Sequence, residues 1–150
     1  MQICQIGHNL LKREQAALDY CAEQGIGTLI RLPLAHGAAF GRYATQKPPE
    51  FEFGDLRSTR DPEALVEEHA GGLNFSFLWE GTGKTPAQAA LRFVVDQPGV
   101  TAAIPGTKKM EHLQDNVGAA DVAPLTAQEL RRVEEVATAL AEKRSHQQRR

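Results

Sequence analysis

The sequence has few of the features that mark secreted, membrane-embedded or nucleic-acid-binding proteins. Only two of its 150 residues are cysteines, Cys4 and Cys21, which provide no disulfide framework and are typical of a reducing compartment. No hydrophobic run approaches the roughly 18 residues of a membrane helix, and the N-terminus lacks a signal-peptide pattern. The net charge of -2 argues against a nucleic-acid or membrane surface. We therefore expect a cytoplasmic protein that binds neither membranes nor nucleic acid.

The rest of the composition is that of a globular protein. Hydrophobic residues make up 41% of the chain and charged residues 24%. A chain of 150 residues is long enough to bury a core, and it shows no internal repeat or low-complexity segment. The sequence therefore predicts a single domain over residues 1–150.

The first part of the chain predicts a βαβ unit. A strand is expected over residues 2–6, and a helix opens at Arg13-Glu14, with Ala17, Leu18 and Cys21 on one face. Glycines at positions 25 and 27 end this helix before a second strand over residues 28–32. Such crossovers join parallel strands and place helices outside the sheet, so we expect an α/β protein.

Residues 38–61 lack periodicity and contain Pro48-Pro49 and Gly54-Asp55, which predicts a long loop. Such a loop is either functional or a floppy surface segment. Asp61 and Pro62 then predict the capped start of a helix. We expect this helix to run to about Ala70 and to end at Gly71-Gly72, with a short helical piece over residues 73–79.

Two capping boxes predict two later helices. Thr85 with Gln88 opens the first, and Thr126 with Glu129 opens a C-terminal helix that has Leu130, Val133, Val136 and Leu140 on one face. The glycine-rich residues 81–85 are similar to the end of a P-loop. However, Leu78 stands where that motif needs a glycine, and no strand is predicted before it, so we exclude a P-loop.

Residues 100–116 are the most informative part of the sequence. An apolar strand over residues 100–104 is broken by Pro105-Gly106, and Thr107 is placed to cap the helix that follows. A helix N-terminus favours an anion, and Lys108 and Lys109 add positive charge there. Asp115 and Asn116 lie about two turns further on, within reach of a base or sugar. The pattern predicts a site for a phosphorylated nucleoside, although an ordinary βα connection with a solvated first turn would also fit.

The order Ile-Pro-Gly-Thr-basic followed by an acidic residue and Asn resembles the C-terminal signature of the aldo-keto reductases. Residues 5–14 resemble the family's Gln-x-x-Tyr-Asn-Leu-Leu-x-Arg-Glu segment, with His8 in place of the usual Tyr, and residues 31–37 resemble its Tyr/Arg-x-Pro-Leu-Ala-x-Gly segment. The resemblance covers nearly the whole chain. It implies the C-terminal portion of a TIM (β/α)₈ barrel, with three parallel core strands that match the sixth to the eighth.

The resemblance also implies how NADPH would be bound. Gln5 would hydrogen-bond the nicotinamide carboxamide, although a satisfied core amide is an equal alternative for this residue. Arg31 would lie against the nicotinamide ring, and the backbone around Pro33, Leu34 and Gly37 would run beside the diphosphate. The contacts implied for the adenosine 2′-phosphate end are Ile104, Gly106, Thr107, Lys108, His112, Asp115 and Asn116, with His112 standing where many relatives have Arg or Gln.

For the complete family barrel, the resemblance implies hydride transfer from NADPH to an aldehyde or ketone. The family's catalytic Asp, Tyr, Lys and His lie on earlier strands, and Tyr20, Tyr43, Lys12 and Lys84 occupy segments that do not match those motifs. We therefore predict an NADPH-binding portion that is inactive alone, has no metal site, and associates with a missing N-terminal half-barrel or with itself. A non-catalytic nucleotide-binding or regulatory module, or a self-associating remnant without ligand, remains an alternative.

Overall fold

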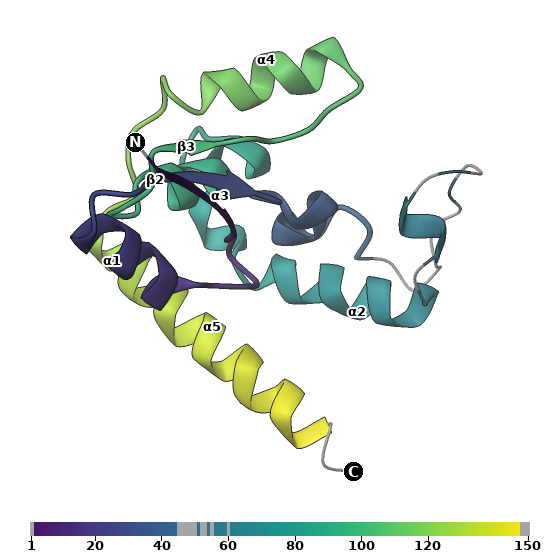
Figure 1. The fold of residues 1–150 in the computed structure, drawn as a ribbon. Coiled ribbons are helices and arrows are strands. Elements are labelled where there is room, and N and C mark those ends of the chain that lie inside the picture. The colour runs from purple at the N-terminus through teal and green to yellow at the C-terminus, as the bar shows by residue number, and fades with distance from the viewer. Residues whose placement is uncertain (1, 45–50, 52–53, 55, 60, 148–150) are drawn as a thin grey trace.

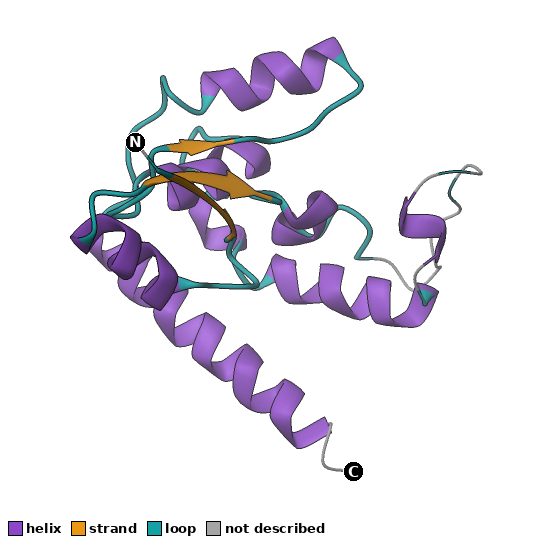
Figure 2. Ribbon diagram, viewed as in Figure 1, coloured by secondary structure: helices purple, strands orange, loops and turns teal. Residues whose placement is uncertain are grey.

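The computed structural model describes residues 2–44, 51, 54, 56–59 and 61–147, in which one small parallel sheet is packed against helices (Figures 1 and 2). The elements in chain order are β1 (Ile3–Gly7), α1 (Gln15–Glu23), β2 (Gly27–Arg31), the 3-10 helices η1 (Ala35–Phe40) and η2 (Leu56–Thr59), α2 (Pro62–Leu73), the 3-10 helix η3 (Ser76–Leu78), α3 (Pro86–Val95), β3 (Ala102–Ala103), α4 (Met110–Gly118) and α5 (Ala127–Gln147).

The strands lie in the order β1-β2-β3, and both neighbouring pairs are parallel. Ile3 is paired with Gly27 and Gly7 with Arg31, while Leu29 is paired with Ala102. β3 is short, but the Ile104 N–H donates to the Ile30 carbonyl at 2.9 Å and so continues the pairing. The expected α/β class with three parallel core strands is confirmed.

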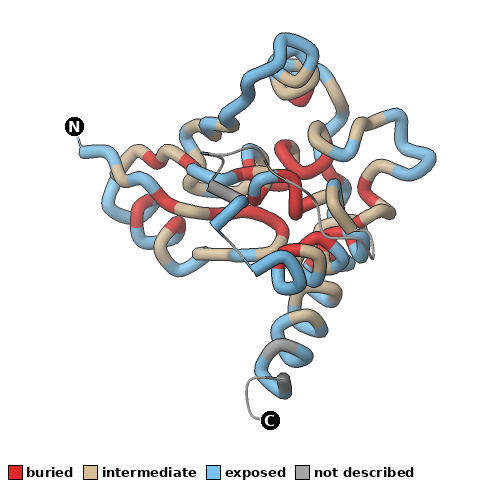
Figure 3. The backbone as a smooth tube through the Cα atoms, turned by 90° about the vertical axis from the view of Figure 1, so that its right-hand side faces the viewer, coloured by how far each residue is buried: buried red, intermediate tan, exposed pale blue. Residues whose placement is uncertain are grey.

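The two faces of the sheet have different surroundings. Ile6, Thr28 and Ile30 alternate along the strands on one face and are buried. Helical residues such as Leu18, Phe93 and Val133 belong to the same buried region. The opposite face carries Ile3, Gln5 and Arg31, which are exposed. In Figure 3, buried residues lie mostly toward the interior of the molecule and exposed residues mostly toward its outside. The folded chain therefore buries its helix-facing side and leaves the other side of the sheet open.

Thr28 is a buried polar residue that joins β2 to the segment leading into β3. Its hydroxyl donates to the Gly99 carbonyl at 2.6 Å and accepts the Thr101 N–H at 3.0 Å. The Thr28 N–H donates in return to the Thr101 hydroxyl at 3.0 Å. The Thr28 hydroxyl is therefore satisfied despite its burial, and β3 is held in register from its first residues.

The capping boxes at Thr85 and Thr126 are found where the sequence placed them. The Thr85 hydroxyl accepts the Gln88 N–H at 3.1 Å, and the Gln88 side chain accepts the Thr85 N–H at 3.1 Å. Thr126 and Glu129 make the same reciprocal pair at the start of α5. A 3-10 helix, and not a strand, comes before residues 81–85, which agrees with the exclusion of a P-loop.

The expected end of α2 is wrong. The Asp61 carboxylate caps the helix as predicted, but α2 continues through both glycines to Leu73. Gly72 is needed for packing, because a Cβ there would lie 1.8 Å from the Ala38 carbonyl oxygen in η1. The predicted loop over residues 38–61 contains the end of η1 and all of η2, and its residues 45–50, 52–53, 55 and 60 lie outside the described part.

His8 is buried at the end of β1 and is held as a neutral ring. Its Nδ1 accepts the Glu14 N–H at 3.1 Å, and its ring stacks on Phe93 with the centroids 5.6 Å apart. No described group hydrogen-bonds its Nε2. Burial, assisted by the nearby Arg13 charge, lowers the pKa of His8 below its ordinary value of 6.5.

This burial makes stability depend on pH. Because the folded state binds a proton on His8 less readily than the unfolded chain, the free energy of unfolding should be highest above pH 6.5 and should fall as the pH drops below that value. His8→Asn keeps an oxygen acceptor near the Nδ1 position but does not titrate, so it should flatten this fall in urea titrations. The exposed His36 provides the control His36→Asn, which should retain it. An unchanged slope in His8→Asn would contradict this assignment.

Candidate functional site

The carboxyl ends of the three strands meet at one edge of the sheet. β1 ends at Gly7, β2 ends at Arg31, and the chain after β3 runs through Ile104 to Lys108. In sheets of parallel strands, ligands bind at this edge because the connecting loops collect there. The sequence-predicted residues 31–37 and 104–108 therefore follow two adjacent strands at the same edge of the sheet.

Gln5 and Arg31 share the open face of the sheet. Gln5 is paired with Leu29 and Arg31 with Gly7, so the two polar residues are diagonal neighbours on adjacent strands. Both are exposed. The Arg31 guanidinium lies over Gly7, where a Cβ would be 3.6 Å from its Cζ atom. An amide and a flat cation are therefore presented together on a surface that the helices leave uncovered.

The chain leaves β2 through a left-handed turn, defined here as residues 32–37. Leu32, Ala35 and His36 have φ angles of 55°, 47° and 57°, and Gly37 has 94°. Residues other than glycine rarely adopt such angles, and those that do are concentrated at functional sites. Pro33 is buried and Leu34 is half-buried within the turn. The turn thus has a backbone conformation that local sequence preference does not favour.

Asn9 holds this turn in place. Its side-chain N–H donates to the Leu32 carbonyl at 3.0 Å. Its side-chain oxygen accepts the N–H groups of Leu11 and Lys12, both at 2.9 Å. Asn9 is buried, so these bonds are shielded from water and fix the end of β1 to the end of β2. The sequence placed Asn9 at the end of the first strand, within the segment that resembles the family, but gave it no role in the site.

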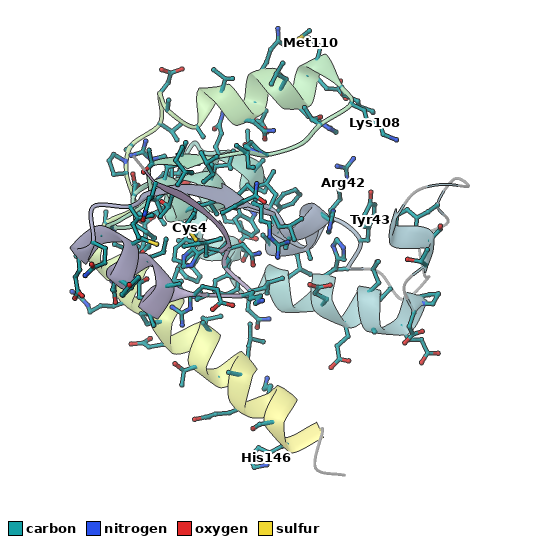
Figure 4. The ribbon with its side chains drawn as sticks, in the orientation of Figure 1. Cys4, Arg42, Tyr43, Lys108, Met110 and His146 are labelled. Carbon is teal, nitrogen blue, oxygen red and sulfur yellow. The ribbon has the colours of Figure 1, made fainter. Side chains whose placement is uncertain are left out.

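Arg42 is a second residue that sequence analysis missed. Its side chain packs on Gly37, because a Cβ at Gly37 would be 3.0 Å from the Arg42 Cδ atom. The backbone N–H of Arg42 also donates to the Gly37 carbonyl at 3.1 Å. Its guanidinium is exposed and forms no ion pair with any described residue. Figure 4 shows it extending from the end of η1 toward the loop that carries Lys108. Its position in an aperiodic stretch gave no signal in the sequence.

The helix after β3 begins later than expected. α4 starts at Met110 with Lys109 as its N-cap residue, and the Thr107 hydroxyl accepts the Lys109 N–H at 3.2 Å. The prediction that Thr107 caps the helix directly is therefore wrong, because the turn needs two further residues before helical geometry begins. Gly106 and Thr107 are exposed in this turn.

The two lysines of this turn have different environments. Lys109 forms an ion pair with Glu111 at 3.3 Å, and the His112 Nε2 lies 3.7 Å from the same carboxylate. Lys108 is exposed and has no ion pair with a described residue. Of the two cations that the sequence placed here, Lys108 is the one whose charge is available to a ligand.

Asp115 and Asn116 are half-buried residues of α4. The Asp115 carboxylate accepts the Thr85 hydroxyl, with distances of 2.9 and 3.1 Å to its two oxygens. It therefore has a partner within the protein, on the neighbouring helix α3.

The arrangement combines available cations with a fixed backbone turn. Arg42 and Lys108 are exposed cations that form no ion pair with a described residue, and Arg31 adds a third cation at the end of β2. Such a set is suited to a ligand that has both phosphates and a flat ring. In the described ranges, no group of three or more His, Cys, Asp or Glu could hold a metal ion. The helices of those ranges also include none with the length and apolarity needed to span a bilayer.

Known sequences that are similar to this chain include reductases. The model of the aldo/keto reductase family matches residues 1–138. The aldo-keto reductase str7 of Strobilurus tenacellus is 32% identical over 126 residues, which are 81% of this chain and 36% of that protein. The L-glyceraldehyde 3-phosphate reductase of Escherichia coli O157:H7 is 26% identical over 140 residues, or 89% of this chain and 40% of that enzyme.

Solved structures agree with the sequence comparison. The glycerol dehydrogenase AKR11B4 from Gluconobacter oxydans superposes with a TM-score of 0.71 at 26% identity, covering 89% of this chain and 41% of that one. An aldo/keto reductase from Klebsiella pneumoniae, in complex with NADP and acetate, gives a TM-score of 0.62 at 22% identity and covers 91% and 39% of the two chains.

The matches extend over most of this chain but over only about 40% of the relatives. This proportion confirms that the three-stranded unit corresponds to part of the relatives' TIM barrel. With the family model matched over residues 1–138, the chain belongs to the aldo/keto reductase family.

Proposed function

We propose that this chain is the C-terminal NADPH-binding portion of an aldo/keto reductase, which in its complete form reduces an aldehyde or ketone. The observation that carries the proposal is the exposure of two cations at the carboxyl edge of the sheet, Arg42 and Lys108, neither of which forms an ion pair with a described residue. The Klebsiella pneumoniae relative was solved with NADP, which supports the use of this cofactor.

The nicotinamide end of the cofactor would lie on the open face of the sheet. Gln5 can donate to and accept from a carboxamide, because an amide side chain carries both kinds of group. Arg31 presents a planar guanidinium on the same face and can stack on the ring. NADPH bound here would supply the hydride, while these two residues would fix the orientation of its ring.

The diphosphate would lie along the left-handed turn. The backbone around Pro33, Leu34 and Gly37 would run beside the phosphate oxygens, since glycine permits close approach of the backbone. Arg42 would add a guanidinium that can bond a phosphate through two N–H groups. Its stem rests on Gly37, so the charge is placed next to the turn and needs little reorganisation on binding.

The adenosine end would occupy the turn before α4 and lie along that helix. Ile104, Gly106 and Thr107 would line the approach, and Lys108 would pair with the 2′-phosphate. His112 would reinforce this contact, most strongly when it is protonated. Asn116 would reach the base or sugar. Asp115 would do the same, because its carboxylate, which already accepts the Thr85 hydroxyl, has lone pairs for further hydrogen bonds.

Nucleotide binding provides the first test. Calorimetric titration should show that the chain binds NADPH more tightly than NADH, because only NADPH carries the 2′-phosphate. Lys108→Gln should weaken NADPH binding by about tenfold and leave NADH binding almost unchanged. Arg42→Gln should weaken both by a similar factor, because both cofactors carry the diphosphate. A folded wild-type chain that binds neither nucleotide would refute the proposal.

Catalysis provides the second test. The chain spans about 40% of its relatives, and no residue of it is assigned to proton donation. We expect the isolated chain to oxidise no NADPH in the presence of aldehydes or ketones, as measured by the absorbance of the reduced nicotinamide. Turnover that follows the chain through purification and disappears in Arg31→Ala would contradict this expectation. Binding without turnover would also be expected of a regulatory module. A complementing half-barrel must therefore be added to distinguish a regulatory module from a portion of a reductase.

The exposed apolar surface supports association with another polypeptide. Met110, Leu113 and Val117 lie on one side of α4 and are 68%, 45% and 64% exposed, and Ile3 on β1 is 58% exposed. β1 and β3 are edge strands of the described sheet. Monomeric proteins rarely leave both strand edges and apolar helix faces open. We propose that a missing N-terminal half-barrel, or a second copy of the chain, covers these surfaces.

Association provides the third test. Sedimentation of the isolated chain should reveal species larger than a monomer, and Leu113→Lys should shift the distribution toward the monomer by placing a charge in the apolar stripe. The exposed Glu135 of α5 provides the control Glu135→Lys, which should not change the distribution. A single monomeric species at all concentrations would count against self-association and leave the half-barrel as the candidate partner.

A further inference from the structure

The two cysteines of the chain lie on neighbouring elements of the fold. Cys4, which is labelled in Figure 4, is in the middle of β1, and Cys21 is near the end of α1. Cys4 is paired with the buried Thr28 of β2, and paired residues point to the same face of a sheet, so Cys4 faces the helices. Leu18 and Cys21 form the buried side of α1. The strand and the helix therefore direct one thiol each into the same layer.

The two thiols are in contact within this layer. The Cys4 side chain packs against the buried cluster that contains Cys21, and a hydrogen bond joins the two side chains. A disulfide forms readily only where two cysteine side chains already point toward each other, because otherwise the backbone has to move. The contact between Cys4 and Cys21 therefore supplies the arrangement that a disulfide between β1 and α1 needs.

The two sulfur atoms differ in their access to solvent. Cys4 is half-buried on β1, which is an edge strand of the described sheet, whereas Cys21 is only 4% exposed. Burial, with the neighbouring Cys4 side chain as a second cause, raises the pKa of the Cys21 thiol above its ordinary value. Cys21 therefore stays protonated near neutral pH, and a small reagent in solution reaches Cys4 first.

We propose that Cys4 and Cys21 are a modification site, at which a low-molecular-weight disulfide such as glutathione disulfide converts them to a reversible disulfide between β1 and α1. The Cys4 thiolate attacks one sulfur atom of the reagent and releases one small thiolate. The Cys21 sulfur then attacks the Cys4 sulfur of this mixed disulfide, loses its proton to solvent and releases the second small thiolate. Two protein thiols are thereby oxidised, and the small disulfide is reduced to two thiols.

The disulfide would lie away from the proposed nucleotide site. Gln5 follows Cys4 in β1, and successive residues of a strand point to opposite faces, so the cross-link and the Gln5 side chain are on opposite sides of the sheet. The inference therefore does not depend on the proposed function. The effect of the bond is on stability, because it closes residues 4–21 into a loop and so restricts the unfolded chain.

The test is to treat the reduced chain with excess glutathione disulfide and then to block the remaining thiols with N-ethylmaleimide. The intact mass should be that of one chain less two hydrogen atoms. Trypsin cuts after Lys12 and Arg13, so peptides 1–12 and 14–31 should stay joined until dithiothreitol is added. The oxidised chain should melt about 5 °C above the reduced chain. A glutathione adduct on Cys4 without joined peptides, or a disulfide between two chains, would overturn the proposal.

Two variants test the order of the two steps. Cys21→Ala keeps a small apolar side chain in the core and should stop at the mixed disulfide on Cys4. Cys4→Ser should react at least about tenfold more slowly than Cys21→Ala, because its remaining thiol is buried and protonated. The oxidant should raise the melting temperature of neither variant. Equal reaction rates in the two variants would overturn the assignment of Cys4 as the attacking thiol. An unchanged melting temperature in the oxidised wild type would overturn the effect on stability.

Discussion

The hydrogen bonds of Asn9 are the constraint on which the rest of the site depends. The side chain connects the end of β1 to the Leu32 carbonyl and at the same time organises the turn that leads into α1. Leu32 adopts a left-handed conformation at this point, and the next five residues follow the path that this conformation sets. Gly37 and, through it, Arg42 are placed by that path. One buried amide thus links two strand ends, a strained turn and a cation about thirty residues away.

Two kinds of interaction, apolar burial and polar contacts, have different roles in the folded molecule. Burial of apolar residues between the sheet and helices α1, α3 and α5 supplies the general driving force for folding. Polar contacts then decide where the peripheral elements lie: Thr28 sets the start of β3, and Thr85 holds α4. Hydrogen bonds are directional and hydrophobic burial is not, so polar contacts define the position of an element more closely. The elements that would touch a ligand are fixed in this way.

The sequence predicted most local features, although not the start of α4, and it predicted long-range features poorly. The strands, the caps at Asp61, Thr85 and Thr126, and the parallel arrangement follow from residues that are close in the chain, and all are confirmed. The role of Gly72 could not be predicted, because it depends on the Ala38 carbonyl of a distant segment. The resemblance named most candidate site residues, but it could not reveal that Asp115 already has Thr85 as a partner or that Arg42 packs on Gly37.

The left-handed turn also affects the entropy of ligand binding. Leu32, Ala35 and His36 could each be replaced by glycine without steric cost, and glycine would make the segment more mobile in the free protein. Side chains at these positions instead restrict the backbone before any ligand arrives. A segment that is already ordered loses little conformational entropy when it binds, so more of the interaction energy is retained as affinity. The strain of the turn, which costs stability during folding, would thus be offset by a lower ordering cost at the moment of binding.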